Sequence, residues 1–168
     1  MNKKGFTLIE LLVVISIIGV LATVVLGALG DARSQARDVR RLSEMKQIEL
    51  ALDMYYSEYG NYPTTDGDGC GGWDLGNKDL QLLTNKLGEY MPVAPNDFIR
   101  SGTCEGHRYY RYGAGGGGCP VSKGAYYVLG VTDMETTGRP HPNSPGWSCP
   151  SRNWQGEFDW VVGKFENE

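Results

Sequence analysis

Two hydrophobic patterns follow one another in the first 59 residues, and no proline interrupts either. Residues 6–30 are apolar almost throughout, and a run of about 20 apolar residues is long enough to span a bilayer as a helix. In residues 31–59 the apolar positions recur every three or four residues, the spacing of one helix face. We therefore expect one continuous helix over residues 6–59, membrane-spanning first and amphipathic afterwards. The amphipathic stripe comprises Ala32, Ala36, Val39, Leu42, Met45, Ile48, Leu52, Tyr55 and Tyr59.

The charged residues of the second segment fall between these apolar positions. A helix with one apolar stripe buries that stripe and leaves its charged faces in water, so we expect a sheet to cover the stripe. Gly60 and Pro63 then predict the end of the helix, because glycine favours the C-terminal cap and proline cannot continue it. The residues expected to face solvent are Arg33, Arg37, Arg40, Arg41, Glu44, Lys46, Glu49, Asp53 and Glu58.

The rest of the chain favours short elements joined by loops. Residues 108–112, 124–131 and 160–165 are rich in aromatic and β-branched side chains, which predicts three strands. The glycine-rich residues 113–118 separate the first two strands as a hairpin loop, and the leucines of residues 78–88 predict a short helix. The sequence thus predicts an α+β fold in which the long helix packs on a small antiparallel sheet.

Aromatic residues offer two interpretations, a packed core or a stacking surface for a ligand. Five tyrosines lie in the first two predicted strands, where alternate side chains face the core, and we expect core packing. Trp147 and Trp154 lie in residues 133–156, which have no strong period, and we expect these two at an exposed contact surface. The tyrosines are Tyr109, Tyr110, Tyr112, Tyr126 and Tyr127.

One carboxylate, Glu10, lies inside the apolar run. A charge in hydrocarbon costs about 2.5–3.5 kcal/mol on insertion scales, so the residue demands a functional reason, unless it merely reaches back to the headgroups. Lys3 and Lys4 precede the run and favour a cytoplasmic N-terminus with the remainder exported. A cleavable secretory signal is disfavoured, because the run is too long and residues 27–30 make a poor cleavage site.

Four cysteines follow on the side predicted to be exported, where thiols usually form disulfides. Four cysteines allow three pairings, and we favour the sequential one because it closes the two shortest separate loops. A zinc site is the rival interpretation, but no pair has Cys-x-x-Cys spacing. Asp66 and Asp68 resemble the start of a calcium loop, which fails at Cys70 and Asn77. The favoured pairs are Cys70–Cys104 and Cys119–Cys149.

The N-terminus resembles the class III signal of type IV pilins and type II secretion pseudopilins. The resemblance rests on a basic leader ending in Gly5, on Phe6 after it, and on Glu10 four residues further on. It implies that a prepilin peptidase and methyltransferase of the inner membrane cuts between Gly5 and Phe6 and methylates the Phe6 amine. It also implies that Glu10 assists assembly by meeting the free amine of a neighbouring subunit. The expected organisation is a leader over residues 1–5, a membrane and filament-core helix over 6–30, an amphipathic helix over 31–59 and an exported domain over 60–168.

The resemblance implies a structural subunit that polymerises with itself and other pilins on an inner-membrane assembly platform. The protein would first be a single-pass inner-membrane protein and then part of a filament at the cell surface. A pseudopilin of a type II secretion system has the same N-terminus, so that alternative stays open. A membrane-anchored enzyme is a remote alternative, because the sequence shows no nucleophile elbow, metal-ligand cluster or phosphate loop. We expect no catalytic, cofactor or metal residues, and we expect the scattered acids Asp133, Glu135 and Asp159 to be solvated. The net charge of −4 disfavours nucleic-acid binding by the whole surface.

Overall fold

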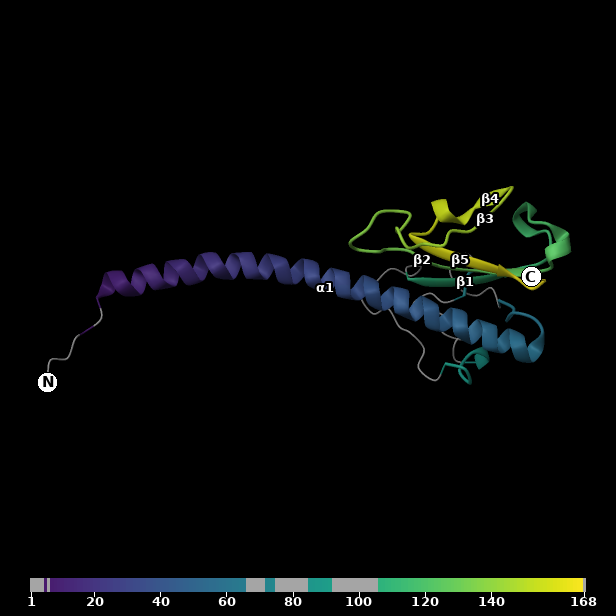
Figure 1. Cartoon of the computed structure of the whole chain (residues 1–168), viewed down its shortest axis with the longest axis horizontal. Helices are drawn as coiled ribbons and strands as arrows, with labels where there is room; N and C mark the ends of the chain where they lie inside the picture. The colour runs from purple at the N-terminus through teal and green to yellow at the C-terminus, as the bar shows by residue number, and fades with distance from the viewer. Residues whose placement is uncertain (1–4, 6, 66–71, 75–84, 92–105, 168) are drawn as a thin grey trace.

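The computed structural model describes residues 5, 7–65, 72–74, 85–91 and 106–167. A single long helix projects from a small domain, with the N-terminus at the far end of the rod (Figure 1). The helix is α1 (Leu8–Tyr59), and the strands are β1 (His107–Tyr112), β2 (Tyr126–Val131), β3 (Ser148–Cys149), β4 (Arg152–Asn153) and β5 (Trp160–Phe165). The described residues also form the 3₁₀ turns η2 (Gly116–Gly118), η3 (Val121–Lys123) and η4 (Trp154–Gly156).

Helix α1 runs unbroken for 52 residues, about 78 Å at 1.5 Å per residue. Thr7 caps its N-terminus, so the helix begins at Leu8, two residues after the predicted start. Gly60 ends it in the left-handed conformation, with φ 70° and its N–H bonded to the Tyr56 carbonyl. The continuous helix and its glycine stop are therefore confirmed.

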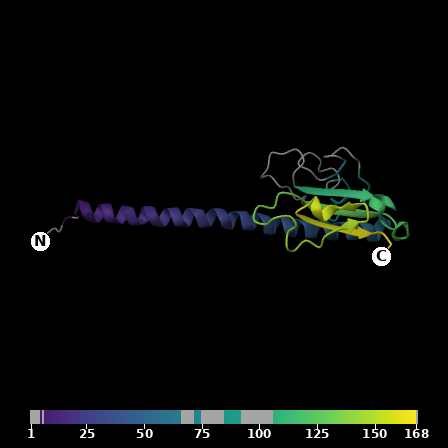
Figure 2. The ribbon, with the colours of Figure 1, turned by 90° about the horizontal axis from the view of Figure 1, so that it is seen from above.

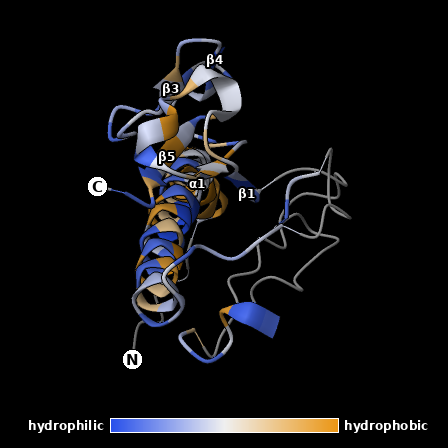
Figure 3. Ribbon diagram, turned by 90° about the vertical axis from the view of Figure 1, so that its right-hand side faces the viewer, coloured by the Kyte–Doolittle hydropathy of each residue, from blue (hydrophilic) through white to orange (hydrophobic). Residues whose placement is uncertain are grey.

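The domain is built on an antiparallel sheet of order β1–β2–β5. Val128 of the central strand lies opposite Tyr110 and Gly163, and all six residues of β2 are buried. The strands run along the C-terminal half of α1 and cover one side of it (Figures 2 and 3). The three predicted strands and the α+β fold are thus confirmed. Strand β2 begins two residues later than predicted, because Gly124 has φ 77° and stands before it.

An apolar cluster fills each face of the sheet. The first joins Ile48 and Leu52 of α1 to the sheet residues Tyr109, Tyr127 and Leu129. The second lies on the opposite face, beneath the chain that leads from β2 to β5. The five tyrosines are buried or half-buried, as predicted for core packing.

The expectation of exposed tryptophans at 147 and 154 is wrong. Trp154 is 0% exposed and Trp147 is half-buried, and both belong to the second cluster with Tyr126 and Phe165. Since the second sheet face is apolar, it needs a cover, and the irregular segment supplies these large rings. The Trp147 ring lies so close to Gly163 that an added Cβ there would be 2.3 Å from it.

The prediction of a buried apolar stripe is also wrong for its N-terminal part. Ala32, Ala36 and Val39 are exposed, the last at 66%, whereas Arg41 and Glu44, expected in solvent, are buried. The middle of the stripe is confirmed, since Met45, Ile48 and Leu52 are all 0% exposed, whereas Tyr59 at its end is 51% exposed. The buried face of the helix therefore changes from apolar at residues 45–52 to charged at residues 38–44, towards the N-terminus.

Two loops complete the comparison with the sequence. The glycine-rich loop between β1 and β2 contains η2 and η3, and Gly117 has φ 58° with an added Cβ only 2.8 Å from the Trp154 ring. Of the predicted helix over 78–88, residues 85–88 are described, and Leu87 is buried in the core. The calcium-like residues Asp66 and Asp68 lie outside the described residues.

Candidate functional site

The carboxylate of Glu10 lies in a capping box with Thr7 at the start of α1. The Thr7 backbone N–H and hydroxyl donate to Glu10 Oε2 at 2.9 and 2.8 Å, and the Glu10 N–H donates to Thr7 Oγ1 at 3.3 Å. This reciprocal pattern satisfies two donors at the helix start. The predicted site residue Glu10 therefore has partners within its own chain, close to the predicted cleavage point. Gly5 precedes this box, and Phe6 lies outside the described residues.

The first half of α1 exposes its apolar side chains on all sides. Every residue from Leu8 to Arg33 is exposed, including Val20 at 67% and Leu26 at 69%. We call residues 8–33 the bare half and residues 34–59 the docked half of the helix. In the described part of the chain, α1 is the one helix long and apolar enough to cross a membrane. Such a surface requires either lipid or other apolar helices around it.

An exposed apolar seam continues from the bare half along the docked half. Its members lie three, four or eleven residues apart, which places them on one helix face. Val39 is 66%, Leu50 56% and Met54 44% exposed, so the face points away from the sheet. The seam comprises Ala32, Ala36, Val39, Leu50 and Met54.

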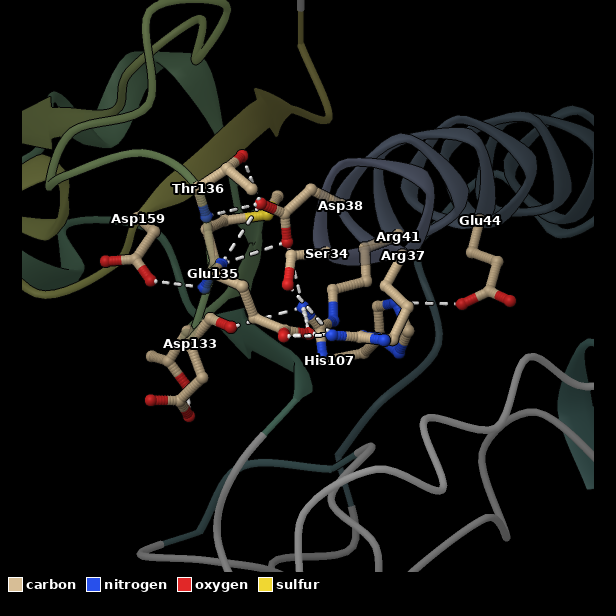
Figure 4. Close-up of polar contacts among 12 residues, drawn as sticks. Ser34, Arg37, Asp38, Arg41, Glu44, His107, Asp133, Glu135, Thr136 and Asp159 are labelled. Carbon is tan, nitrogen blue, oxygen red and sulfur yellow. Dashed lines mark hydrogen bonds and ion pairs between the residues drawn. The ribbon is translucent and has the colours of Figure 1, made fainter. Parts of the chain in front are cut away.

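A cluster of charged groups lies where the bare half ends (Figure 4). Asp38, which is 3% exposed, accepts hydrogen bonds from the backbone N–H groups of Glu135 and Thr136 at 3.0 and 2.8 Å. The Thr136 hydroxyl and Arg41 Nη1 also donate to this carboxylate, at 2.7 and 2.9 Å. We call Arg37, Asp38 and Arg41 of α1, with Glu135 and Thr136 of the loop after β2, the helix–loop latch.

Two arginines hold the other carboxylate of the latch. Arg37 donates to Glu135 from Nε at 2.8 Å and from Nη2 at 2.5 Å, and Arg41 Nη1 donates to it at 3.1 Å. The Arg37 hydrogen bond lowers the pKa of Glu135 to about 2. Burial alone raises the pKa of Asp38, but its donors from Glu135, Thr136 and Arg41 hold that pKa below its usual value. Both carboxylates are therefore charged at neutral pH.

The charged interface extends from the latch to strand β1. Glu44 is 8% exposed and accepts from Arg40 Nε at 2.7 Å. Its second oxygen lies 3.4 Å from Nε2 of His107, the first residue of β1 (Figure 4). Helix α1 thus meets the domain mainly through charged groups next to the bare half and mainly through the apolar cluster further along, where Asp53 also pairs with Lys164 of β5.

The expectation that the acids of the second half are solvated is wrong for two of them. Glu135 belongs to the latch, and Asp159 is 7% exposed. Asp159 accepts from the Met134 N–H at 2.9 Å and from Arg139 Nε at 2.8 Å. Asp159 is buried and Glu135 is half-buried, and each lies beside donors that compensate its charge, which the spacing of isolated acids along a sequence does not reveal.

Sequence reasoning missed Asp38, although a signal was present. Residues 38, 41, 45, 48 and 52 recur at helical spacing, so the stripe traced backwards from Met45 passes through Arg41 and Asp38. These two carry opposite charges at an i,i+3 spacing and form an ion pair at 2.9 Å. The burial of Asp38 and Arg41 could therefore have been predicted from this spacing if charged residues had been counted as members of the stripe.

A disulfide joins Cys119, which follows η2, to Cys149 of β3. This is the second of the two predicted pairs, and it ties the β1–β2 loop to the segment that covers the outer sheet face. Cys70 and Cys104 lie outside the described residues. Within the described ranges, no three His, Cys, Asp or Glu residues are grouped so that they could hold a metal ion.

Comparison with known proteins adds to this geometry. Residues 1–26 match the family model of the prokaryotic N-terminal methylation motif. The chain is 44% identical over 65 residues to the type II secretion system core protein G of Escherichia coli K12, which covers 39% of this chain and 45% of the relative. It is 38% identical over 90 residues to a fimbrial protein of Neisseria meningitidis, which covers 51% of this chain and 52% of the relative.

The match to the methylation motif covers the capping box and residues 8–26 of the bare half. The chain spans about half the length of the curated relatives that it matches. No solved structure matches it. The chain thus carries the prokaryotic N-terminal methylation motif on a long helix packed against an antiparallel sheet, and part of it is similar to type II secretion core proteins and to a fimbrial protein.

Proposed function

We propose that this protein is a structural subunit of a type IV pilus or a related filament and that it polymerises through α1. The observation that carries the proposal is the bare half, a helix that is apolar all round and exposed over its whole length. Its side chains leave water when they enter a bilayer or pack against copies of the same helix. Each Å² of apolar surface that is buried contributes about 25 cal/mol.

Processing and assembly follow from the N-terminal residues. A prepilin peptidase and methyltransferase cuts between Gly5 and Phe6 and methylates the new amine. In the filament, the Glu10 carboxylate pairs with the Phe6 amine of a neighbouring copy, because a buried charge requires a partner of opposite sign. Before assembly the capping box with Thr7 supplies donors to that carboxylate. The bare half then spans the inner membrane with a cytoplasmic N-terminus, and an assembly platform extracts it into a surface filament.

The exposed seam supports the same proposal. Val39, Leu50 and Met54 extend the apolar surface of the bare half along the outer face of the docked half. Head-to-tail contacts that do not close on themselves generate a helical filament rather than a ring.

A pseudopilin of a type II secretion system is the second candidate. The identity of 44% over 65 residues to a type II secretion core protein favours it. The match to a fimbrial protein, which extends over 90 residues, favours a pilin. Both roles require the same N-terminal processing and the same helix-mediated polymerisation.

The test is to express the full chain with a prepilin peptidase and an assembly system and to analyse membranes and sheared filaments. We expect an intact mass that lacks residues 1–5 and carries one methyl group. Glu10→Ala should remain folded in the membrane but yield few filaments, whereas Asp31→Ala, a matched change at an exposed acid of the same helix, should assemble normally. Retention of the leader, or filaments at the normal yield from Glu10→Ala, would contradict the proposal.

A further inference from the structure

The helix–loop latch is the first place where α1 meets the domain. All residues from Leu8 to Arg33 are exposed, Ser34 is the first half-buried one, and Asp38 is the first buried one. The latch therefore lies at the point where the bare half becomes the docked half. If the free part of the helix tilts relative to the domain, the contacts of the latch are the first that change.

Two kinds of contact hold the docked half on the sheet. Further along the helix, Met45, Ile48 and Leu52 pack in the apolar cluster. The hydrophobic attraction has no direction of its own, so these residues restrict the orientation of the helix only through the fit of their side chains. The latch is directional, because a hydrogen bond weakens steeply as its angle departs from linearity. Asp38 binds two successive backbone N–H groups, of Glu135 and Thr136, which cannot follow a moving helix unless the loop backbone moves as well.

The loop itself is fixed to the sheet. It follows β2 directly, and the Met134 N–H donates to Asp159 at 2.9 Å, immediately before β5. The Asp159 N–H in turn donates to the Val131 carbonyl at 3.0 Å. The Asp133 carbonyl, held in this turn, accepts from Arg41 Nη1 at 3.2 Å. The latch therefore connects the helix to two strands and not to a free loop.

Buried ion pairs add less net stability than their number suggests, because each charge loses its water, but they can specify one arrangement among several. We propose that the helix–loop latch is a positioning site that fixes the angle between the bare half of α1 and the domain. This inference rests on the proposed function in one respect, namely that the geometry matters because a second copy of the chain must dock on it. In a head-to-tail filament every subunit repeats the same contact, so an angular spread in one subunit is repeated along the polymer.

The experiment measures that angle in the full, unassembled chain in detergent micelles. Spin labels are placed at Thr23 in the bare half and at Val121 in the domain through non-natural amino acids, which leaves the cysteines unchanged. Double electron–electron resonance then gives the distribution of distances between them. Residue 23 lies about 22 Å beyond Asp38 along the helix, so a small change of angle becomes a large displacement.

Asp38→Asn is the principal variant, and Asp53→Asn is its matched control. Asp53 also joins α1 to the sheet, through Lys164 Nζ at 2.8 Å, but at a half-exposed position in the docked half. Both substitutions remove one helix carboxylate at equal cost in volume. We expect Asp38→Asn to widen the distance distribution about two-fold, because the lever arm amplifies the freed angle, and Asp53→Asn to leave it unchanged.

A second variant keeps the test decisive if Asp38→Asn folds poorly. Thr136→Val removes one donor to Asp38 and leaves every charge paired, so we expect a folded domain with the Cys119–Cys149 disulfide and a smaller widening. An unchanged distribution in Thr136→Val, or equal widening in Asp53→Asn, would overturn the inference. A lower unfolding temperature without widening would also overturn it, because that is the result of a purely stabilising contact. The measurement needs no filaments, so an absence of filaments in the unmodified protein would count against the proposed function alone.

Discussion

The bare and docked halves of α1 belong to one continuous helix, yet their side chains serve different partners. The bare half is apolar on all sides and exposed, whereas the docked half buries one face of mixed chemistry and exposes another. Backbone hydrogen bonds alone give the same helix in both. Burial therefore depends on what surrounds each half: the domain covers one face of the docked half, and we propose that a membrane or other subunits cover the bare half.

The largest expected effect separates the two halves with one type of substitution. Ile48 is 0% and Ile17 55% exposed. Ile48→Ala leaves a cavity in the apolar cluster and should lower the free energy of unfolding of the domain by about 2–5 kcal/mol. Ile17→Ala should leave that free energy unchanged, and its cost should appear only in filament yield. Thermal unfolding of the solubilised chain measures the first, and equal destabilisation by both variants would contradict the division.

A smaller effect on stability is expected at the exposed seam. Most of the seam lies in the docked half, but we propose that it contacts other subunits, as the bare half does. Val39→Glu should change the free energy of unfolding by no more than about 0.5 kcal/mol, because the site is exposed. It should nevertheless reduce filament yield by placing a charge on an apolar contact face. Ser122→Glu, at an exposed position of η3 outside the helix, is the control for added charge. Normal filament assembly by Val39→Glu would show that the seam is not part of the contact between subunits.

The carboxylate of Glu135 in the latch should make the stability of the docked half depend on pH. The pKa of Glu135 is about 2 in the folded protein, below the ordinary glutamate value of 4.5, so its paired state stabilises the fold above the unfolded pKa. That contribution is lost as pH falls from about 4.5 towards 2. We expect the unfolding temperature to fall over this window and to fall less steeply in Glu135→Gln, measured by circular dichroism. A parallel pH dependence of both proteins would show that other carboxylates control acid unfolding.

The sequence predicted those parts of the molecule in which a local residue pattern is enough to determine the structure. The helix, the strands 108–112 and 160–165 and the role of the glycine at position 60 follow from periodicity and backbone preference. The latch could not be found in this way, because Asp38 is buried only beside the backbone of Glu135 and Thr136, about a hundred residues away in the chain. Trp154 was misplaced for a related reason. Its irregular segment shows no period, although it covers an apolar sheet face that no local pattern describes.

The smallest expected effect concerns the bare half alone. Gly19 and Gly27 bracket a segment rich in β-branched residues, and each glycine costs about 1 kcal/mol relative to alanine in a helix. The isolated chain nevertheless shows an unbroken helix, as expected where a bilayer requires every backbone group to be bonded internally.

In a filament, side-chain contacts with neighbouring helices can offset the loss of a few backbone hydrogen bonds. We therefore expect residues 19–28 to stretch on assembly while the docked half keeps its helical hydrogen bonds. Gly27→Ala should oppose the stretch by about 1 kcal/mol and shorten the segment in a filament density map. Gly60→Ala is not a suitable control, because Gly60 has φ 70°, whereas Ser57→Ala lies at an exposed position of the docked half and should change nothing in that map. A filament with continuous helical bonding from residue 8 to residue 59 would show that both halves remain the same helix in every environment.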